Sequence, residues 1–230
     1  MSHLESNETS KQKIHQQLRR SIIMGRLKPN EKLDIQSLAN LYGSSVTPVR
    51  EALHILEQEG LVTIKTRSGY YVAYVTLKEL RDMLDLREIL ELAAVERAAK
   101  FITEEQLAEL EHIHAGYTGD DDESYDRYTD ENRNFHYTIA KASGNLEIAN
   151  TLVQLLDRLA RFMVLRHAGH SQDKTHARIV EALRAHDQVA ACQAMLSEIV
   201  ETRNVLLERL MQEHGANWEI RSINTQNDFR

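Results

Sequence analysis

Residues that break helices, form disulfides or anchor a chain in a membrane are scarce in this sequence. Its 230 residues include 2 prolines, 9 glycines and one cysteine, Cys192. So few breakers argue against an all-β fold. A lone cysteine excludes an intramolecular disulfide, and we expect it to be a small buried or half-buried side chain. No apolar run approaches the roughly 20 residues of a membrane helix, and residues 1–11 lack the apolar core of a signal peptide. We therefore expect a cytoplasmic protein without a membrane partner.

A pair of short helical segments separated by a glycine turn is the clearest local pattern. Asp34 is a suitable N-cap for a helix over residues 35–42, which should end at Gly43. In the next segment Pro48 is tolerated, because the first turn of a helix leaves backbone N–H groups without partners. Its apolar residues recur at i, i+3, i+4 and i+7 and predict a buried stripe, formed by Val49, Ala52, Leu53 and Leu56. Helix, tight turn and helix is the helix-turn-helix arrangement.

Several polar residues near the start of the second helix lie off the buried stripe. In a helix-turn-helix such positions meet base edges and phosphates of a major groove. They are Ser45, Thr47, Arg50 and His54.

The flanking segments complete a larger unit. An amphipathic helix is predicted over residues 11–25, with its apolar side formed by Ile14, Leu18, Ile22 and Ile23. Residues 62–72 combine β-branched and aromatic arms with a polar tip that contains Gly69, which predicts a β-hairpin. Three helices and a hairpin make a winged helix-turn-helix, with Lys65, Arg67 and Gly69 at the wing.

The charge distribution agrees with this division. The net charge is −7, yet residues 1–75 carry 10 Lys and Arg against 7 Asp and Glu, a balance of +3. Residues 76–230 carry 18 against 28, a balance of −10. The basic part contains the helix-turn-helix, as phosphate contact requires. Because +3 is modest, one copy would bind DNA weakly, and we expect a homodimer that doubles the contacts.

Four blocks in this region, residues 25–29, 45–53, 59–61 and 68–72, closely resemble the DNA-binding domain of GntR-family transcription regulators. The resemblance, together with the helix positions, implies a set of DNA-contacting residues: Gln36, Ser45, Thr47, Pro48, Arg50, Lys65, Arg67 and Gly69. One position departs from the family pattern, because Val46 stands where the family usually has an arginine that contacts DNA. Valine cannot make a bidentate contact to guanine, so either operator preference differs or more of the reading falls to Arg50 and the wing.

The rest of the chain is predicted to be helical almost throughout. Capping boxes at Thr76–Glu79 and Thr103–Gln106 mark the starts of two helices. The predicted helices span about 77–100, 103–114, 124–143, 146–167, 174–185 and 188–212, with an acidic loop at 119–123. The predicted fold class is therefore mainly α, a winged helix-turn-helix followed by an all-α helical bundle. The expected divisions are a disordered tail at 1–10, a DNA-binding domain at 11–75, an effector-binding and dimerisation domain at 76–212 and a tail at 213–230.

This helical half is similar to the FadR branch of the GntR family, which has an FCD-type ligand-binding domain. The resemblance is carried by residues 86–91, 132–136, 142–145 and 176–183. Many regulators of that branch hold a divalent metal with one carboxylate and three histidines. The matching positions here are Asn132, His136, His176 and Glu198, a set of two nitrogens and two oxygens that suits zinc, manganese or nickel.

Spacing supports the grouping of these four residues. Asn132 and His136 are four apart on one helix and point the same way. His176 and Glu198 are equally far from the turn at Asp187, and such positions lie side by side in an antiparallel helix pair. Two of the four depart from the usual ligands, so a metal-free pocket in which these groups bind each other or a ligand is the alternative. His136 as an ordinary hydrogen-bonded core histidine is another.

Arg87 is the predicted anchor for an effector. It lies among leucines, where a lone cation is costly unless paired, and the resemblance implies that it forks onto the carboxylate of an organic acid beside His136 and His176. The alternative is an intrahelical pair with Glu91 or Glu88. Arg161 and Arg166 are further candidates, expected at the surface, and His167 and His170 are expected to face solvent from a loop.

These features predict a transcription regulator that binds a near-palindromic double-stranded operator and senses a small molecule, and the family tendency favours a repressor. A metal-dependent hydrolase with an appended DNA-binding domain is the alternative function. Against an enzyme, the chain has no His-Glu-x-x-His, no phosphate-binding glycine loop and no Gly-x-Ser-x-Gly. A DNA-binding architectural protein without an effector would not need buried polar residues in its helical half.

Overall fold

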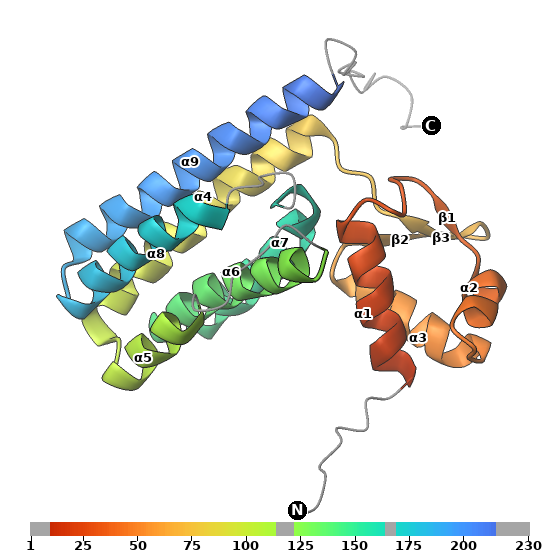
Figure 1. Cartoon of the computed structure of the whole chain (residues 1–230), viewed down its shortest axis with the longest axis horizontal. Coiled ribbons are helices and arrows are strands. Elements are labelled where there is room, and N and C mark those ends of the chain that lie inside the picture. Colours follow the sequence, from red (N-terminus) through yellow and green to blue (C-terminus); the bar gives the residue numbers. More distant parts are fainter. Residues whose placement is uncertain (1–9, 114–121, 164–168, 215–230) are drawn as a thin grey trace, which may run out of the picture.

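A computed structural model describes residues 10–113, 122–163 and 169–214 (Figure 1). Several predictions lie outside these residues: most of the two tails, most of the acidic loop, Arg166 and His167. The side chain of His170 is likewise not described. Within the described residues, no helix is both long and apolar enough to cross a membrane.

The N-terminal part is a three-helix unit with a small sheet. Its elements are α1 (Ser10–Ile23), β1 (Lys32–Leu33), α2 (Ile35–Leu41), α3 (Val46–Gln58), β2 (Val62–Lys65) and β3 (Gly69–Val72). The predicted hairpin is confirmed: β2 and β3 pair antiparallel, with Val62 opposite Val72 and Lys65 opposite Gly69. The two-residue strand β1 was not predicted, and it pairs with β3 on the other side, giving the order β1-β3-β2.

Both local predictions for the helix-turn-helix are confirmed. Asp34 accepts a hydrogen bond from the backbone N–H of Ser37 at 2.8 Å and caps α2. The apolar stripe of α3 is buried and packs against α1, where Ile14, Leu18 and Ile22 form the facing surface. The shared core therefore fixes the orientation of α3 and leaves its opposite side free for other contacts.

The second part is a bundle formed by α4 (Leu77–Phe101), α5 (Glu104–Ile113), α6 (Asp122–Ala142), α7 (Leu146–Met163), α8 (Gly169–Arg184) and α9 (Gln188–His214). Both capping boxes form, at the starts of α4 and α5. Two boundaries differ from prediction: α6 begins inside the acidic stretch, and α8 begins five residues earlier than expected.

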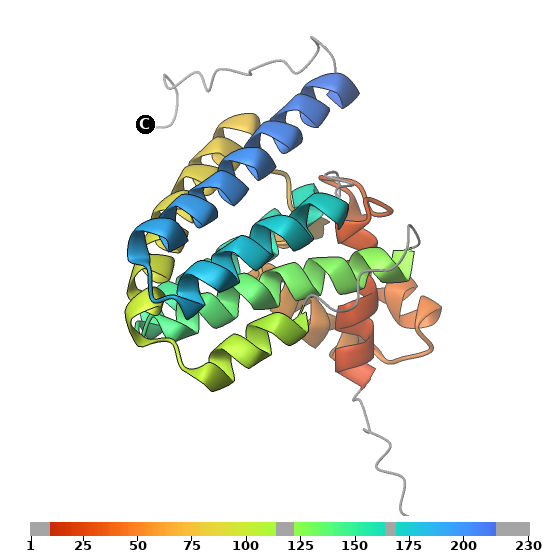
Figure 2. The same ribbon diagram turned by 60° about the vertical axis from the view of Figure 1, so that its left-hand side comes forward.

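The longest helices, α4 and α9, lie side by side along one edge of the bundle, and α8 lies next to α9 (Figures 1 and 2). The main apolar core lies between α4, α5, α6, α8 and α9, and a second cluster joins α4, α7 and α9. Cys192 is half-buried against the main core, as expected, and burial raises the pKa of its thiol. This arrangement places one side of α6 in the middle of the bundle.

The two parts are in contact through charged side chains. Arg19 of α1 reaches Asp130 of α6 at 3.2 Å and Asp157 of α7 at 3.3 Å. Arg161 of α7 donates to the backbone carbonyl of Ala73, in the segment that joins the two parts. The expectation that Arg161 lies at the surface is therefore wrong, because half-burial against the connecting segment gives this side chain an acceptor across the boundary.

Candidate functional site

The first candidate surface is the exposed side of α3. Ser45 is the N-cap of this helix, and Ser45, Thr47 and Arg50 are exposed. Pro48 is half-buried in the first turn, as the helix start allows. Gln36 is exposed on the preceding helix, where its amide lies 3.4 Å from Asn40. The predicted DNA contacts on α2 and α3 thus lie on or beside one helix-turn-helix surface.

Val46 has a structural role in this surface. It is half-buried and packs against the core of the N-terminal part, next to α2. His54, one of the polar residues off the stripe, approaches Tyr70 of β3, with its ring nitrogen 3.3 Å from the tyrosine hydroxyl. This contact ties α3 to the hairpin.

The hairpin tip presents two further cations. Lys65 and Arg67 are exposed, and the lysine ammonium lies 4.3 Å from the centre of the Tyr71 ring. The tip turns through Arg67 at φ 61° and Gly69 at φ 111°, and at the latter value a glycine is strongly favoured because other side chains rarely adopt it. The wing therefore carries positive charge at the end where phosphates could be contacted.

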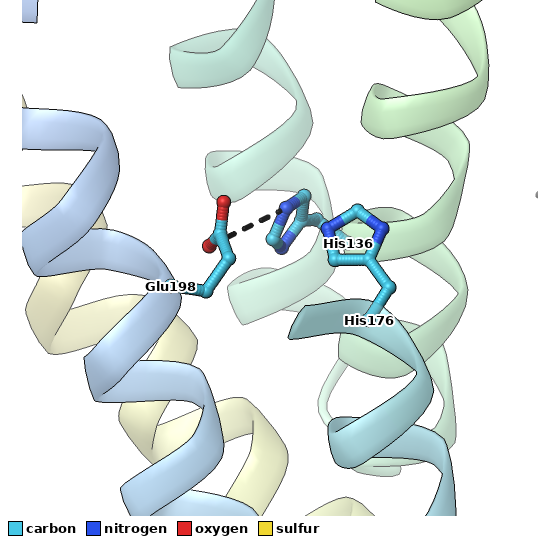
Figure 3. Close-up of side chains that lie close together, drawn as sticks. All are labelled: His136, His176 and Glu198. Atoms are coloured by element: carbon cyan, nitrogen blue, oxygen red, sulfur yellow. Dashed lines mark ion pairs between the residues drawn. The ribbon is translucent and has the colours of Figure 1, made fainter. Parts of the chain in front are cut away.

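The second candidate site is a polar cluster buried in the helical bundle. Arg87 and Glu91 of α4, His136 of α6, His176 of α8 and Glu198 of α9 are all at most 1% exposed. Figure 3 shows His136, His176 and Glu198 pointing towards one another from three helices. Buried charges of this kind are expensive unless they are paired, so their contacts define what the site can do.

Arg87 is at the centre of this cluster. Its Nε donates to Glu91 Oε1 at 2.7 Å, and its Nη2 donates to Glu198 Oε2 at 3.3 Å. Arg87 thus forms the intrahelical pair with Glu91 that was the alternative from the sequence, and it lies beside His136 and Glu198 of the predicted metal site. Burial by itself raises the pKa of the Glu91 carboxyl, but the hydrogen bond from His136 and the positive charge of Arg87 outweigh burial and the pKa is lowered.

His136 is held between a group that only accepts hydrogen bonds and one that only donates them. Its Nδ1 lies 2.5 Å from Glu91 Oε2, and its Nε2 lies 3.1 Å from Arg87 Nη2. A carboxylate only accepts and a guanidinium only donates, so the hydrogen must be on Nδ1 and the lone pair on Nε2. The lone pair is therefore directed at Arg87.

The remaining predicted residues border the same space. His176 stacks on Phe135, with ring centres 3.9 Å apart, and meets the edge of His136 at 5.4 Å. Asn132 lies one turn before His136 on α6 and is 7% exposed. Its Oδ1 is buried and has no hydrogen-bond partner among the residues that the structure describes. Thr202, which the sequence did not indicate, donates to Glu198 Oε1 at 3.0 Å.

The donor types suit a divalent metal. His136, His176 and Glu198 offer ligand atoms within 4.8 Å of one another, and the Asn132 oxygen is a fourth candidate. Metal–ligand distances of about 2.0–2.2 Å place tetrahedral ligands about 3.4 Å apart. His136 Nε2 and Glu198 Oε2 are 3.9 Å apart, so a small approach would suffice. Glu91 would orient His136 from behind, as carboxylates do for metal-bound histidines.

A cavity of about 390 Å³ leads from the surface to His176. It lies between α5 and α8 and is lined by Leu110, Glu111, His176, Ala177, Val180, Glu181 and Arg184. At its rim Arg184 of α8 pairs with Glu111 of α5 at 2.5 Å. His176 of the buried cluster thus lines this cavity together with Leu110 and Val180 of the main apolar core.

The fold and the buried cluster together indicate the class of protein. A winged helix-turn-helix followed by a helical domain with a buried polar cluster is the architecture of a DNA-binding transcription regulator. Comparison with known families is more specific: the profile for bacterial regulatory proteins of the gntR family matches residues 10–72, and the FCD domain profile matches residues 82–201. The chain belongs to the GntR family and carries an FCD domain.

Similar proteins agree with this assignment. The HTH-type transcriptional regulator YdhC of Bacillus subtilis is 30% identical over 193 residues, covering 80% of this chain and 85% of YdhC. The HTH-type transcriptional repressor RspR of Escherichia coli is 26% identical over 221 residues, covering 94% and 96%. The solved structure of Escherichia coli McbR/YncC has the same fold, with a TM-score of 0.71 at 21% identity, covering 88% of this chain and 99% of that one. The protein is thus a transcription regulator and not an enzyme, and the alternative of a hydrolase has no support.

Proposed function

We propose that this protein is a cytoplasmic, homodimeric repressor whose affinity for its operator is changed by a small organic acid. The acid binds in the FCD domain at Arg87, His136 and His176. The observation that carries the proposal is a fully buried arginine within a polar cluster beside a cavity that reaches His176. An arginine offers a planar fork of donors that matches a carboxylate.

The carboxylate of the acid replaces the carboxylate of Glu198 as a partner of Arg87. Arg87 Nη2 is held by Glu198 at 3.3 Å, a longer contact than the 2.7 Å bond from its Nε to Glu91. A ligand carboxylate entering past His176 competes for that weaker contact and releases Glu198 on α9. The packing of α9 against α4 and α6 changes as a result. Such a ligand alters operator binding only if it prefers one of two arrangements of the dimer.

DNA recognition is assigned to α3 and the wing. Ser45, Thr47, Pro48 and Arg50, with Gln36 beside them, enter a major groove, and Lys65, Arg67 and Gly69 contact the adjacent backbone. Two subunits related by a two-fold axis bind two half-sites, so the operator is a near-palindrome. Because Val46 lacks a donor, base reading falls mainly on Arg50.

The subunits associate through the outer face of α4 and α9. This face carries exposed apolar side chains, Leu86, Ile89, Leu196 and Val200, of which Ile89 is 66% exposed. Arg203 of α9 pairs with Asp85 at 2.9 Å and with Glu88 at 3.1 Å on α4, which holds the two helices in register beneath the face. An apolar patch bordered by charges is typical of an association surface.

A divalent metal, zinc, manganese or nickel, is proposed at Asn132, His136, His176 and Glu198. When bound, such an ion supplies positive charge that links α6, α8 and α9 and attracts an anionic effector. The chain's own contribution is the orientation of His136 by Glu91 and of Glu198 by Thr202. These residues position the donors whether or not the ion is present.

The test begins with the full chain and a random duplex library. Selection should yield a near-palindromic sequence bound by a dimer, and mono- and dicarboxylic acids are then added to the purified complex. At least one acid should change the operator Kd by fivefold or more, in the range typical of allosteric coupling. Arg87→Met should abolish that response and leave binding without the acid intact, whereas Lys78→Met, which removes an exposed cation paired with Asp82 on the same helix, should keep the response. A monomer that binds no duplex at low salt would refute the proposal.

A further inference from the structure

Arg87 occupies the position between the metal-binding atoms. Its Nη2 lies 3.1 Å from His136 Nε2 and 3.3 Å from Glu198 Oε2, and those two atoms are 3.9 Å apart. The lone pair of His136 that a metal would need is therefore already directed at a cation. The guanidinium and a metal ion therefore compete for this place.

We propose that Arg87 is a built-in competitor for divalent metal, so that the guanidinium is the resident cation of the cluster and weakens the binding of the ion. The inference rests on the proposed metal-binding role of His136, His176 and Glu198, and it adds which residue controls that role. Two observations support this proposal: the hydrogen bonds that Arg87 makes, and the balance of charges around it.

The balance of charges in the cluster also favours the guanidinium over a metal ion. Arg87 stands against two buried carboxylates, Glu91 and Glu198, with His136 neutral in the tautomer that its contacts fix. Adding a dication next to the guanidinium brings two like-charged groups together at low dielectric, which is unfavourable. If the arginine charge is removed, the two carboxylates are left without a counter-ion, and a dication balances them fully.

The competition predicts a gain of function on mutation. Arg87→Met should bind zinc at least tenfold more tightly than the unaltered protein, with one ion per chain. His136 Nε2 and Glu198 would then be free of the guanidinium, and Glu91 would still orient the imidazole. Adding His136→Ala to Arg87→Met should remove the gained affinity, because it removes one of the competing donors.

The experiment uses the full chain, dialysed against chelator and titrated with zinc, and in separate titrations with manganese and with nickel. Calorimetry gives the affinity and elemental analysis gives the bound zinc per chain. Arg203→Met is the matched control, since that arginine also pairs with two carboxylates between α4 and α9 but lies away from the donors. It should bind zinc no better than the unaltered protein. Arg87→Gln, which keeps polar contacts to Glu91, is a second variant in case Arg87→Met folds poorly. Refolding of either variant that requires zinc also supports the proposal.

Two results would overturn it. If the unaltered protein binds zinc as tightly as Arg87→Met and Arg87→Gln, the guanidinium does not compete, although the proposed metal site stands. If folded variants and unaltered protein all fail to bind zinc, manganese and nickel, both the competition and the metal site are refuted. The response of operator binding to organic acids is measured separately and survives either result.

Discussion

At the scale of single residues, His136 shows how hydrogen-bond partners determine what a side chain can do. Glu91 can only accept and Arg87 can only donate, so the imidazole between them has one allowed arrangement of its hydrogen. The ring is also fully buried, and its loss leaves a void and removes the hydrogen bond to Glu91 Oε2.

We therefore expect His136→Ala to lower the free energy of unfolding by about 2–4 kcal/mol, from the cavity and the unsatisfied Glu91 oxygen. Operator affinity in the absence of ligand should change less than threefold, because α3 and the wing are remote from this cluster. Denaturant unfolding and fluorescence anisotropy with labelled operator measure the two effects. A folded variant that no longer binds the operator would show that His136 contributes to DNA binding directly.

A substitution of Arg50, on the exposed side of α3, tests the DNA-binding surface instead of the buried cluster. Arg50→Ala should weaken operator binding by about 1–3 kcal/mol, or roughly fivefold to 150-fold, because one arginine contact to a base or phosphate is lost. The helical content and dimer should be unchanged, since the side chain is exposed. Arg81→Ala, an exposed arginine of α4, is the matched control and should bind normally. Unaltered affinity in Arg50→Ala would remove Arg50 from the recognition surface.

At the scale of elements, the start of α4 combines a cap with an acidic side chain that reaches back. Thr76 Oγ1 accepts from the backbone N–H of Glu79 at 3.1 Å, and the Glu79 carboxylate accepts from the N–H of Thr76 at 2.7 Å. The hydrogen bonds from Thr76 lower the pKa of Glu79. A carboxyl with a lowered pKa stabilises the fold above its ordinary pKa, and this stabilisation is lost as the pH falls below about 4.

Thr76→Ala should therefore destabilise the protein by about 1 kcal/mol at pH 7. The difference from the unaltered protein should be smaller at pH 3, because more of Glu79 is protonated there than at pH 7 and its hydrogen bonds from Thr76 are weaker in both proteins. Thermal unfolding followed by circular dichroism at both pH values measures this. An equal difference at the two pH values would mean that the carboxylate of Glu79 adds nothing to the cap.

Elements whose signal is local could be predicted from the sequence. Helix starts at Thr76 and Thr103 carry their caps in neighbouring residues, and the stripe of α3 repeats at helical spacing. Strand β1 has two residues, too few to show alternation, and it forms because Asn30 and Glu31 exchange backbone hydrogen bonds with Val72. The first five residues of α8 are polar or glycine, so apolar spacing alone placed its start too late.

Part of the candidate site could also be predicted from the sequence. Spacing around the turn at Asp187 placed His176 near Glu198, and the structure brings these two together with His136. Spacing does not determine rotamers, and so it did not reveal that Arg87 Nη2 contacts both His136 and Glu198. Contacts between distant segments, such as Arg161 with Ala73, depend on how the two parts pack and leave no mark in local sequence.

At the scale of the whole molecule, α6 connects the buried cluster to the DNA-binding part. Asn132 and His136 face the cluster, while Asp130 and Arg133 of the same helix face α1 and α7. Arg133 binds Asp157 through two hydrogen bonds, at 2.6 and 3.0 Å. The same aspartate receives Arg19 of α1, and α1 packs on α3. A shift of α6 therefore reaches the recognition helix through Asp157, besides any path along α4.

Removing this aspartate should loosen the contact between the two parts. In Asp157→Ala, chymotrypsin should cleave the connecting segment after Tyr74 roughly tenfold faster, because the rate reports how often the contact opens. Tyr74 is already 52% exposed, so opening needs to free only the backbone around it. Asp85→Ala, which breaks a surface ion pair within the helical domain, is the control and should be cleaved at the normal rate.

A substitution of Arg19, the partner of Asp157 on α1, tests whether the ion pair between them holds the two parts together. Arg19→Ala should speed cleavage as much as Asp157→Ala does, and the double variant should be no faster than either single variant, because residues that act as one contact are not additive. If the two effects instead multiply, Arg19 and Asp157 stabilise the arrangement separately and the ion pair between them is not the link. If neither variant changes the rate, the connecting segment is held by other contacts, among them the bond from Arg161 to Ala73. The path from α6 to α3 through Asp157 is then excluded, and α4 becomes the element through which a ligand in the bundle reaches the DNA-binding surface.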